Sequence, residues 1–247
     1  MTAAERVWAA QGDAEQAKGR LFGPFGGGVA ELPGVRLMAS GLDQSGRNGG
    51  DVHDAAAVDI ERVRAWFAGR RVPWGLRLPA GTRWRHGTRL RSQRCLTLDA
   101  DALRPAEVPP GVRVRLAGPG DLETVAEIDA RAFAGSPADS SAWMAPTLGA
   151  AGFCVAIASL GGIDVGTATA VPTDEWGGPA VGLYGVAVVA EARRRGIGAA
   201  LSAWLLAQAF AEGAAFAHLN ADTEDAARVY RRLGFVESPG WEIYTDV

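Results

Sequence analysis

The sequence predicts a fold of the α/β or α+β class, built on a mixed sheet. Three observations support this prediction. From residue 111 onward, apolar residues recur with alternating strand and helix periods. Three prolines and one glycine within Arg104–Gly111 interrupt any regular element, which suggests one domain over residues 1–110 and another over 111–247. The composition, 48% hydrophobic and 21% charged, is typical of a globular protein.

The composition also excludes several classes of protein. The longest apolar run, Ala180–Ala190, falls well short of the ~20 residues that a membrane-spanning helix needs. The N-terminus shows neither the basic nor the apolar region of a signal peptide, which favours a cytoplasmic protein. Cys95 and Cys154 lack metal-ligand spacing, so we expect no metal and two reduced thiols, with a single disulfide left open.

The net charge of −3 is unevenly distributed along the chain. Residues 1–110 carry 16 basic and 12 acidic side chains, a balance of +4. Residues 111–247 carry 9 basic and 16 acidic side chains, a balance of −7. The two parts are therefore expected to present different surfaces.

The first part reads as a mixture of strand and helix. Residues 20–35 and 41–51 are rich in glycine and predict loops. An amphipathic helix is predicted over Asp59–Arg70, because apolar residues recur on one face. Val72–Leu78 and Gln93–Leu98 predict strands. No catalytic signature is visible here, so the role of residues 1–110 stays unassigned.

The second part has a more regular order. A strand at 112–116 precedes a helix that Asp121 is expected to cap, running to about Phe133. A short helix is predicted around 139–145, and the Gly161-Gly162 turn joins strands near 153–159 and 164–171. The remaining predicted elements are a buried strand at 181–188, a helix at 196–212, a strand at 215–220, a helix at 223–233 and strands at 234–237 and 241–246.

A helix is predicted to begin among arginines and glycines at Arg193–Gly198, directly after the buried strand. The first turn of a helix has unpaired backbone N–H groups and a partial positive charge. Gly196 and Gly198 leave that turn open to close approach, which favours binding of a phosphate or pyrophosphate. Neither the Walker pattern nor the dinucleotide fingerprint is present.

These residues resemble the GNAT superfamily of N-acetyltransferases. The acetyl-CoA signature of that family, Arg/Gln-x-x-Gly-x-Gly/Ala, is matched by Arg193–Gly198. A second block, a helix that ends in Tyr-x-x-x-Gly-Phe, is matched by Tyr230–Phe235. The resemblance covers about residues 112–247 and implies a mixed, mostly antiparallel sheet flanked by helices. The first part, which is a smaller α/β domain, resembles a degenerate GNAT-like half.

The resemblance implies a cofactor site and one catalytic residue. Acetyl-CoA would be the co-substrate, and its pantetheine arm would lie along the edge of the strand at Val186, Ala187 and Val188. Asn220 and Thr223 are further candidates for contacts with pantetheine. Tyr230 would act as the acid that protonates the departing thiolate. The pyrophosphate would be held at Arg193, Arg194, Arg195, Gly196, Ile197, Gly198 and Ala199.

The predicted reaction lacks an obvious general base. A lysine-like amine, of pKa ~10.4, must lose a proton before it attacks the thioester. The candidate bases in the sequence are Asp129, Asp174, Glu175 and Glu237, and Tyr184 could orient a water. His218, on the predicted strand beside the cofactor, is most simply a structural residue. The missing base supports an alternative function, a non-catalytic CoA-binding regulatory module.

The arginines of the first part raise the question of partners. Residues 77–94 contain six arginines and His86, with Trp84 among them, a pattern that nucleic-acid contact or a solvated strand edge would both explain. The pI of 5.7 argues against a protein devoted to nucleic acid. We therefore expect an amine acceptor, a small molecule or a peptide, without membrane or nucleic-acid binding; a homodimer stays open.

Overall fold

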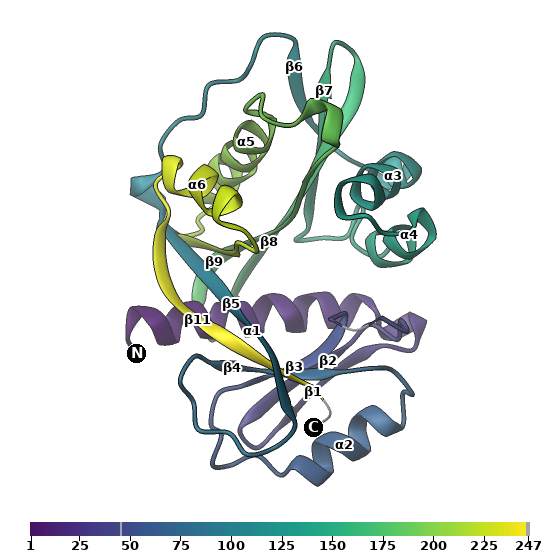
Figure 1. Cartoon of the computed structure of the whole chain (residues 1–247), viewed down its shortest axis with the longest axis vertical. Coiled ribbons are helices and arrows are strands. Elements are labelled where there is room, and N and C mark those ends of the chain that lie inside the picture. Colours follow the sequence, from purple (N-terminus) through teal and green to yellow (C-terminus); the bar gives the residue numbers. More distant parts are fainter. Residues whose placement is uncertain (45, 246–247) are drawn as a thin grey trace. The chain divides into compact units, whose positions relative to one another are not determined.

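The computed structural model describes residues 1–44 and 46–245 and divides them into two units (Figure 1). The first unit contains Met1–Cys95, the short segment Glu175–Gly177 and the chain from Glu237 onward. The second contains Leu96–Asp174 and Gly178–Val236. The contacts thus divide the chain inside a strand, after Cys95, whereas the sequence suggested a boundary near residue 110.

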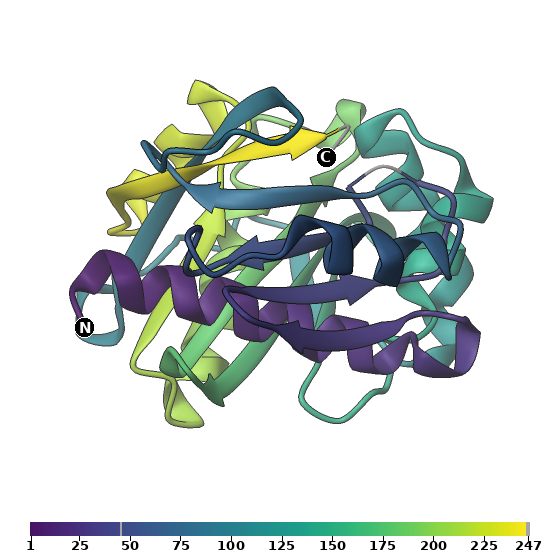
Figure 2. The ribbon, with the colours of Figure 1, turned by 90° about the horizontal axis from the view of Figure 1, so that it is seen from below.

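The first unit is a sheet with one helix on each face. The residues of β2 contact both helices, because alternate residues of a strand point to opposite faces of the sheet. Val35 and Leu37 share a hydrophobic cluster with α2, whereas Arg36 and Met38 lie next to α1. Figures 1 and 2 show α1 running along β1 and β2. Its elements are α1 (Ala3–Leu21), β1 (Gly28–Leu32), β2 (Val35–Ala39), β3 (Asn48–Val52), α2 (Ile60–Ala68), β4 (Gly75–Pro79) and β5 (Thr88–Asp99), which continues into the second unit.

Each of the two predicted loops of the first unit contains a strand. β1 lies within residues 20–35, and β3 begins within 41–51 and ends at Val52. The glycines of β3 serve close packing and not a turn. A Cβ at Gly49 would lie 2.7 Å from the carbonyl oxygen of Gly75, and one at Gly50 would lie 2.7 Å from Leu37. Glycine is needed there because β3 and its parallel neighbour β4 approach closely.

The second unit follows the predicted order closely. In Figure 1, α5 and α6 lie on one side of the strands, and α3 and α4 lie on the other. From β5, the strand order is β5-β10-β9-β8-β7-β6. The elements are β6 (Val112–Leu116), α3 (Leu122–Phe133), α4 (Pro137–Met144), β7 (Cys154–Leu160), β8 (Ile163–Glu175), β9 (Gly178–Val188), α5 (Ile197–Ala211), β10 (Phe216–Asn220) and α6 (Glu224–Arg232).

Two details of the second part differ from the prediction. The two closing strands are one strand, β11 (Val236–Thr245). Gly240 lies within this strand and does not form a turn. Glycine allows a close approach to β5 there, since a Cβ would lie 2.0 Å from the carbonyl oxygen of Gln93. Asp121 precedes α3 but makes no side-chain cap to that helix. Its carboxylate accepts from the Gly118 N–H and pairs with Arg115.

The two units share an element order. The shared order is three strands, then a helix, then a fourth strand that pairs in parallel with the third. It occurs as β1-β2-β3-α2-β4 in the first unit and as β7-β8-β9-α5-β10 in the second. Cys95 and Cys154 are free thiols. Among the described residues, none of the helices is both long and apolar enough to cross a membrane.

Candidate functional site

The parallel strands β9 and β10 separate part-way along their length. Their paired residues end at Gly182 and His218, although β9 continues to Val188 and β10 to Asn220. Gly185 lies just beyond the last pair and has a φ of +56°, which bends β9 at that point. The edge of Val186–Val188 that faces β10 is therefore open to an added extended chain.

The helix that starts at the end of β9 presents a candidate backbone anion site. Gly196 is the N-cap residue of α5 with φ +81°, and no side chain caps the first turn. Arg194 also has a positive φ, +63°. The N–H groups of the first turn are thus left for an external acceptor, and the helix dipole favours an anion there.

Gly198 places this anion site directly above the open strand edge. A Cβ built on Gly198 would lie 3.8 Å from side-chain atoms of both Val186 and Val188. That spacing is ordinary van der Waals contact, so alanine would fit and a larger side chain would extend across the gap. The sequence motif and the strand edge therefore form one continuous site.

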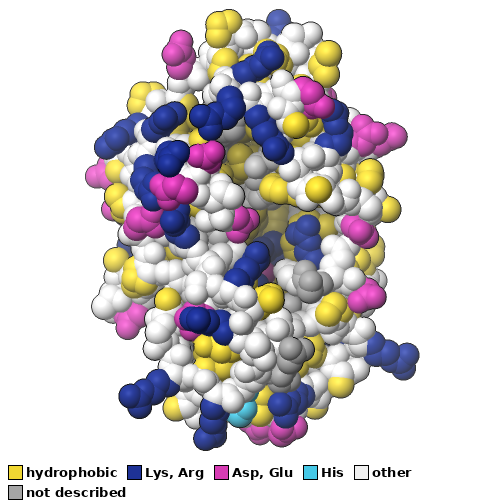
Figure 3. All heavy atoms as spheres, viewed as in Figure 1, with side chains coloured by type: hydrophobic (Ala, Val, Ile, Leu, Met, Phe, Trp, Pro, Cys, Tyr) yellow, Lys and Arg dark blue, Asp and Glu magenta, His cyan; other side chains and the backbone are white. Residues whose placement is uncertain are grey.

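The arginines of the motif are used differently from one another. Arg193 donates to two backbone carbonyls, with Nε 2.9 Å from Val188 O and an Nη atom 2.9 Å from Ala132 O. It braces the turn between β9 and α5. Arg194 is exposed and lies 3.6 Å from Asp225 at the start of α6. Figure 3 shows basic and acidic side chains intermixed over the surface where Figure 1 places α6.

Tyr230 on α6 reaches the first turns of α5. Burial raises the pKa of its phenol well above the ordinary value, and a hydrogen bond with Ser202 acts in the opposite direction. Ser202 in turn donates to Gly198 O over 2.8 Å. The Tyr230 ring lies edge-on to Phe235 with centroids 5.7 Å apart. The phenol is therefore fixed in orientation and stays protonated at neutral pH, as a proton donor must.

Asn220 and Thr223 have different structural roles. The Oδ1 atom of Asn220 is buried at the end of β10 without a hydrogen-bond partner among the described residues. Such an atom is costly unless a ligand or water satisfies it. Thr223 is the N-cap of α6 and accepts from the Ala226 N–H over 3.1 Å. Asn220 therefore fits the pantetheine role better than Thr223 does.

The four predicted bases are engaged elsewhere or exposed. Asp129 accepts a 2.7 Å hydrogen bond from Ser140 of α4, and Asp174 is exposed. Glu175 and Glu237 belong to the first unit. There Arg20 holds the pKa of Glu175 below its usual value, and Glu237 lies 3.8 Å from Arg94. Asp129, Glu175 and Glu237 are therefore each paired with another side chain, and Asp174 is exposed.

Tyr184 and His218 lie together at the point where the strands separate. Their rings are edge-to-face with centroids 6.2 Å apart. A Cβ at Gly182 would lie 2.4 Å from the Tyr184 ring, so glycine is what makes room for that ring. His218 is fully buried, in agreement with the structural role expected from the sequence.

The equivalent position of the first unit cannot bind an anion in the same way. α2 begins at Asp59, whose carboxylate accepts from the N–H groups of Glu61 and Arg62. The first turn of this helix is thus already capped by a negative charge. Beside it, Arg77 of β4 forms two hydrogen bonds, of 2.7 and 3.0 Å, with Asp51 of β3. An ion pair therefore joins these strands at the last pair of their described register, Asp51 and Arg77.

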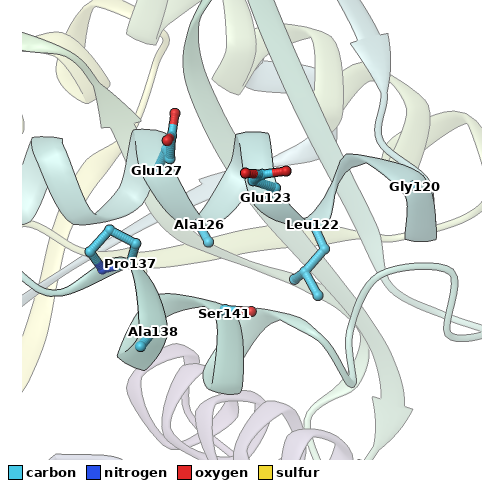
Figure 4. Close-up of a pocket in the computed structure, with 8 residues that line it drawn as sticks. All are labelled: Gly120, Leu122, Glu123, Ala126, Glu127, Pro137, Ala138 and Ser141. Atoms are coloured by element: carbon cyan, nitrogen blue, oxygen red, sulfur yellow. The ribbon is translucent and has the colours of Figure 1, made fainter.

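A further pocket lies between α3 and α4 (Figure 4). It has a volume of about 520 Å³. Glu123 and Glu127 line it on α3, one turn apart, and Ser141 lines it on α4. This pocket was not predicted from the sequence, although its two glutamates are spaced by one turn of the predicted helix.

Comparison with known proteins agrees with this geometry. Residues 122–235 match the model of the Acetyltransferase (GNAT) family. A GCN5-related N-acetyltransferase from Kribbella flavida superposes with a TM-score of 0.73 and 22% identity, covering 98% of this chain and 95% of that one. A putative acetyltransferase of the GNAT family from Novosphingobium aromaticivorans gives 0.60 and 20%, covering 94% and 96%. A comparison with curated proteins finds no match.

Residues 122–235 therefore constitute a domain of the GNAT acetyltransferase family. The likeness to the Kribbella flavida structure extends over nearly the whole chain, which includes the first unit. Together with the repeated element order, this likeness confirms the prediction that the N-terminal half is GNAT-like. The mixed sheet flanked by helices is confirmed as well.

Proposed function

We propose that the protein transfers an acetyl group from acetyl-CoA to a primary amine by direct attack of the amine on the thioester. The observation that carries this proposal is the junction of an uncapped α5 N-terminus with the open edge of β9, bridged at Gly198. A pyrophosphate and a pantetheine arm require those two features side by side. The unsatisfied Oδ1 of Asn220 supports the fit, because it would accept from a pantetheine amide.

The residues of the site would share the work of binding and proton transfer. Backbone N–H groups from Arg194 to Ala199 would bind the pyrophosphate. Acetyl-CoA would supply the acetyl group in activated form, as a thioester. An N–H group of Val186–Val188 would polarise the carbonyl of that thioester. Tyr230, kept protonated by burial, would donate to the departing sulfur. The acceptor would be a small-molecule or peptide amine, and the proposal includes that the protein acts in the cytoplasm.

Two substitutions at Gly198 test the cofactor site. Gly198→Glu introduces bulk and negative charge where the pyrophosphate would bind, so we expect the Kd for CoA, measured by calorimetry, to rise at least about tenfold. Gly198→Ala is the matched control, because its Cβ meets only ordinary contacts, and it should change Kd by less than about threefold. CoA binding that survives the glutamate unchanged would refute the site.

Tyr230→Phe separates catalysis from binding. It should lower kcat by about 10²-fold or more, as loss of a proton donor does, with little change in the Kd for CoA. Because the four candidate bases are paired or exposed, a second candidate function is a regulatory module that binds CoA without turnover. Thiol release from acetyl-CoA across a panel of amines distinguishes them: binding with no turnover on any amine would replace the enzymatic proposal by the regulatory one.

A further inference from the structure

The N-terminal half of β5 is an exposed strand. All five residues of Thr88–Ser92 are exposed, so neither face of the strand is covered. Strands in sheets ordinarily bury at least one face. Leu90 is 61% exposed, which is a high value for a large apolar side chain within a strand. We call residues 83–92, the preceding loop and this strand, the arginine arm.

The arginine arm is strongly basic within an acidic protein. No Asp or Glu occurs between residues 77 and 94, and the net charge of the whole chain is −3. Arg89 pairs with Glu242 of β11 over 2.8 Å. Arg83, Arg85 and Arg91 are exposed, and in the part of the chain that the structure describes no carboxylate pairs with them. Three positive charges are therefore available to a partner.

One edge of this strand is open to backbone pairing. β5 lies between β11 and β10 in the strand order. β10 has five residues and β5 has twelve, so β10 cannot pair with the whole of β5. Thr97, near the far end of β5, donates from its hydroxyl to Ala217 O of β10, and just after β5 the Ala100 N–H donates to Ala215 O. The edge turned away from β11 can thus accept an added strand.

We propose that the arginine arm binds an acidic, extended segment of a partner protein, which adds a strand along Thr88–Ser92. The added backbone would pair with the open edge, acidic side chains would pair with Arg83, Arg85 and Arg91, and an apolar side chain would cover Leu90. Extended peptides bind sheet edges in this manner, with backbone bonds giving affinity and side chains giving specificity.

Two other occupants fit the observations less well. A single-stranded nucleic acid would use aromatic stacking platforms, but Trp84 packs against the core of the first unit and Trp74 stacks on Phe67 with centroids 4.5 Å apart. A nucleic acid would also leave the backbone edge and Leu90 unused. A second copy of the chain would bring two rows of arginine together, which is unfavourable for directly opposed like charges.

The test uses the full-length protein and a fluorescein-labelled decapeptide of alternating Glu and Val. Fluorescence anisotropy should show saturable binding that weakens as salt is raised. Arg91→Glu should raise Kd at least about fivefold, by reversing one charge beside the added strand. Arg62→Glu, the same charge change on the exposed face of α2, should alter Kd by less than about twofold. Both positions are exposed, so thermal midpoints should match that of the parent protein.

Four results would overturn the proposal. The first is no saturable binding of the peptide, and the second is equal weakening by Arg91→Glu and Arg62→Glu. The third is tighter binding of a ten-nucleotide single strand than of the peptide, which would assign the arm to nucleic acid. A dimer in sedimentation that Arg91→Glu dissociates would assign it to a second copy and equally reject the peptide. None of these measurements depends on acetyl transfer.

Discussion

Removal of residues 1–110 should abolish stable folding of the remaining chain, although the sequence suggests a domain over 111–247. The second unit includes Leu96–Asp99, the last part of β5. Leu96 and Leu98 are fully buried there and belong to the same hydrophobic cluster as Leu201 and Leu205 of α5. Thr97 also donates from its hydroxyl to Ala217 O on β10.

The size of the effect follows from these two leucines. Losing a buried leucine side chain costs about 2–5 kcal/mol, so losing both costs roughly 4–10 kcal/mol. A domain is typically stable by only about 5–15 kcal/mol. The matched control begins at residue 96 and keeps this strand segment together with Leu103 and Ala106, which pack on the same cluster.

Urea unfolding followed by circular dichroism compares the two fragments. We expect the 96–247 fragment to unfold cooperatively and the 111–247 fragment to show no folded baseline, or a midpoint lowered by more than 1 M. Equal midpoints for the two fragments would show that the β5 segment does not support the core of the second unit, and the reasoning would then be refuted.

Three further predictions concern single residues. Gly182→Ala should lower the thermal midpoint, because its Cβ would lie 2.4 Å from the Tyr184 ring and overpacking costs about 1–3 kcal/mol; an unchanged midpoint in calorimetry would contradict this contact. Asp59→Ala removes the cap of α2 and should cost about 1 kcal/mol of unfolding free energy in urea, with CoA affinity unchanged; an unchanged unfolding free energy would contradict the capping role of Asp59. Glu15 tests the pH dependence of stability: burial raises the pKa of its carboxyl, but Lys18 and Arg77 outweigh burial and hold it at about 2, against 4.5 for the free group. The stability that this lowered pKa represents is present above pH 4.5 and is lost as the pH falls from about 4.5 to about 2. The stability difference between the native protein and Glu15→Gln should therefore narrow over that interval, and a difference that does not depend on pH would contradict the ion pairing.

The candidate site could be predicted from the sequence because its parts are close together in the chain. Arg193–Gly198 combines the end of a strand, a glycine turn and a helix start, so local backbone geometry alone creates the anion site. Tyr230 was identified through a second motif of the same kind, on a helix whose period is plain. Ser202, which connects Tyr230 to Gly198, was not identified, since a serine within an apolar helix carries no distinctive pattern.

Other features depended on contacts between residues distant in sequence. The strands at β1 and β3 resembled loops, because glycines that permit close packing between strands look the same in sequence as glycines that form turns. The opening between β9 and β10 could not be read from either strand, since it depends on where their pairing ends. The division of β5 between the two units likewise arises from which strands pair with each of its halves.

The sequence by itself determined the second unit's order of elements and the position of its candidate anion site, because hydrophobic periodicity and the start of a helix are local properties. Only the tertiary structure decided which helix start is available. α5 begins uncapped beside an open strand edge, whereas α2 is capped by Asp59 beside strands that the Asp51–Arg77 ion pair joins. The physical reason is that capping and strand pairing occupy the same backbone groups that a ligand would bind, and the remaining free groups are known only once every partner is in place.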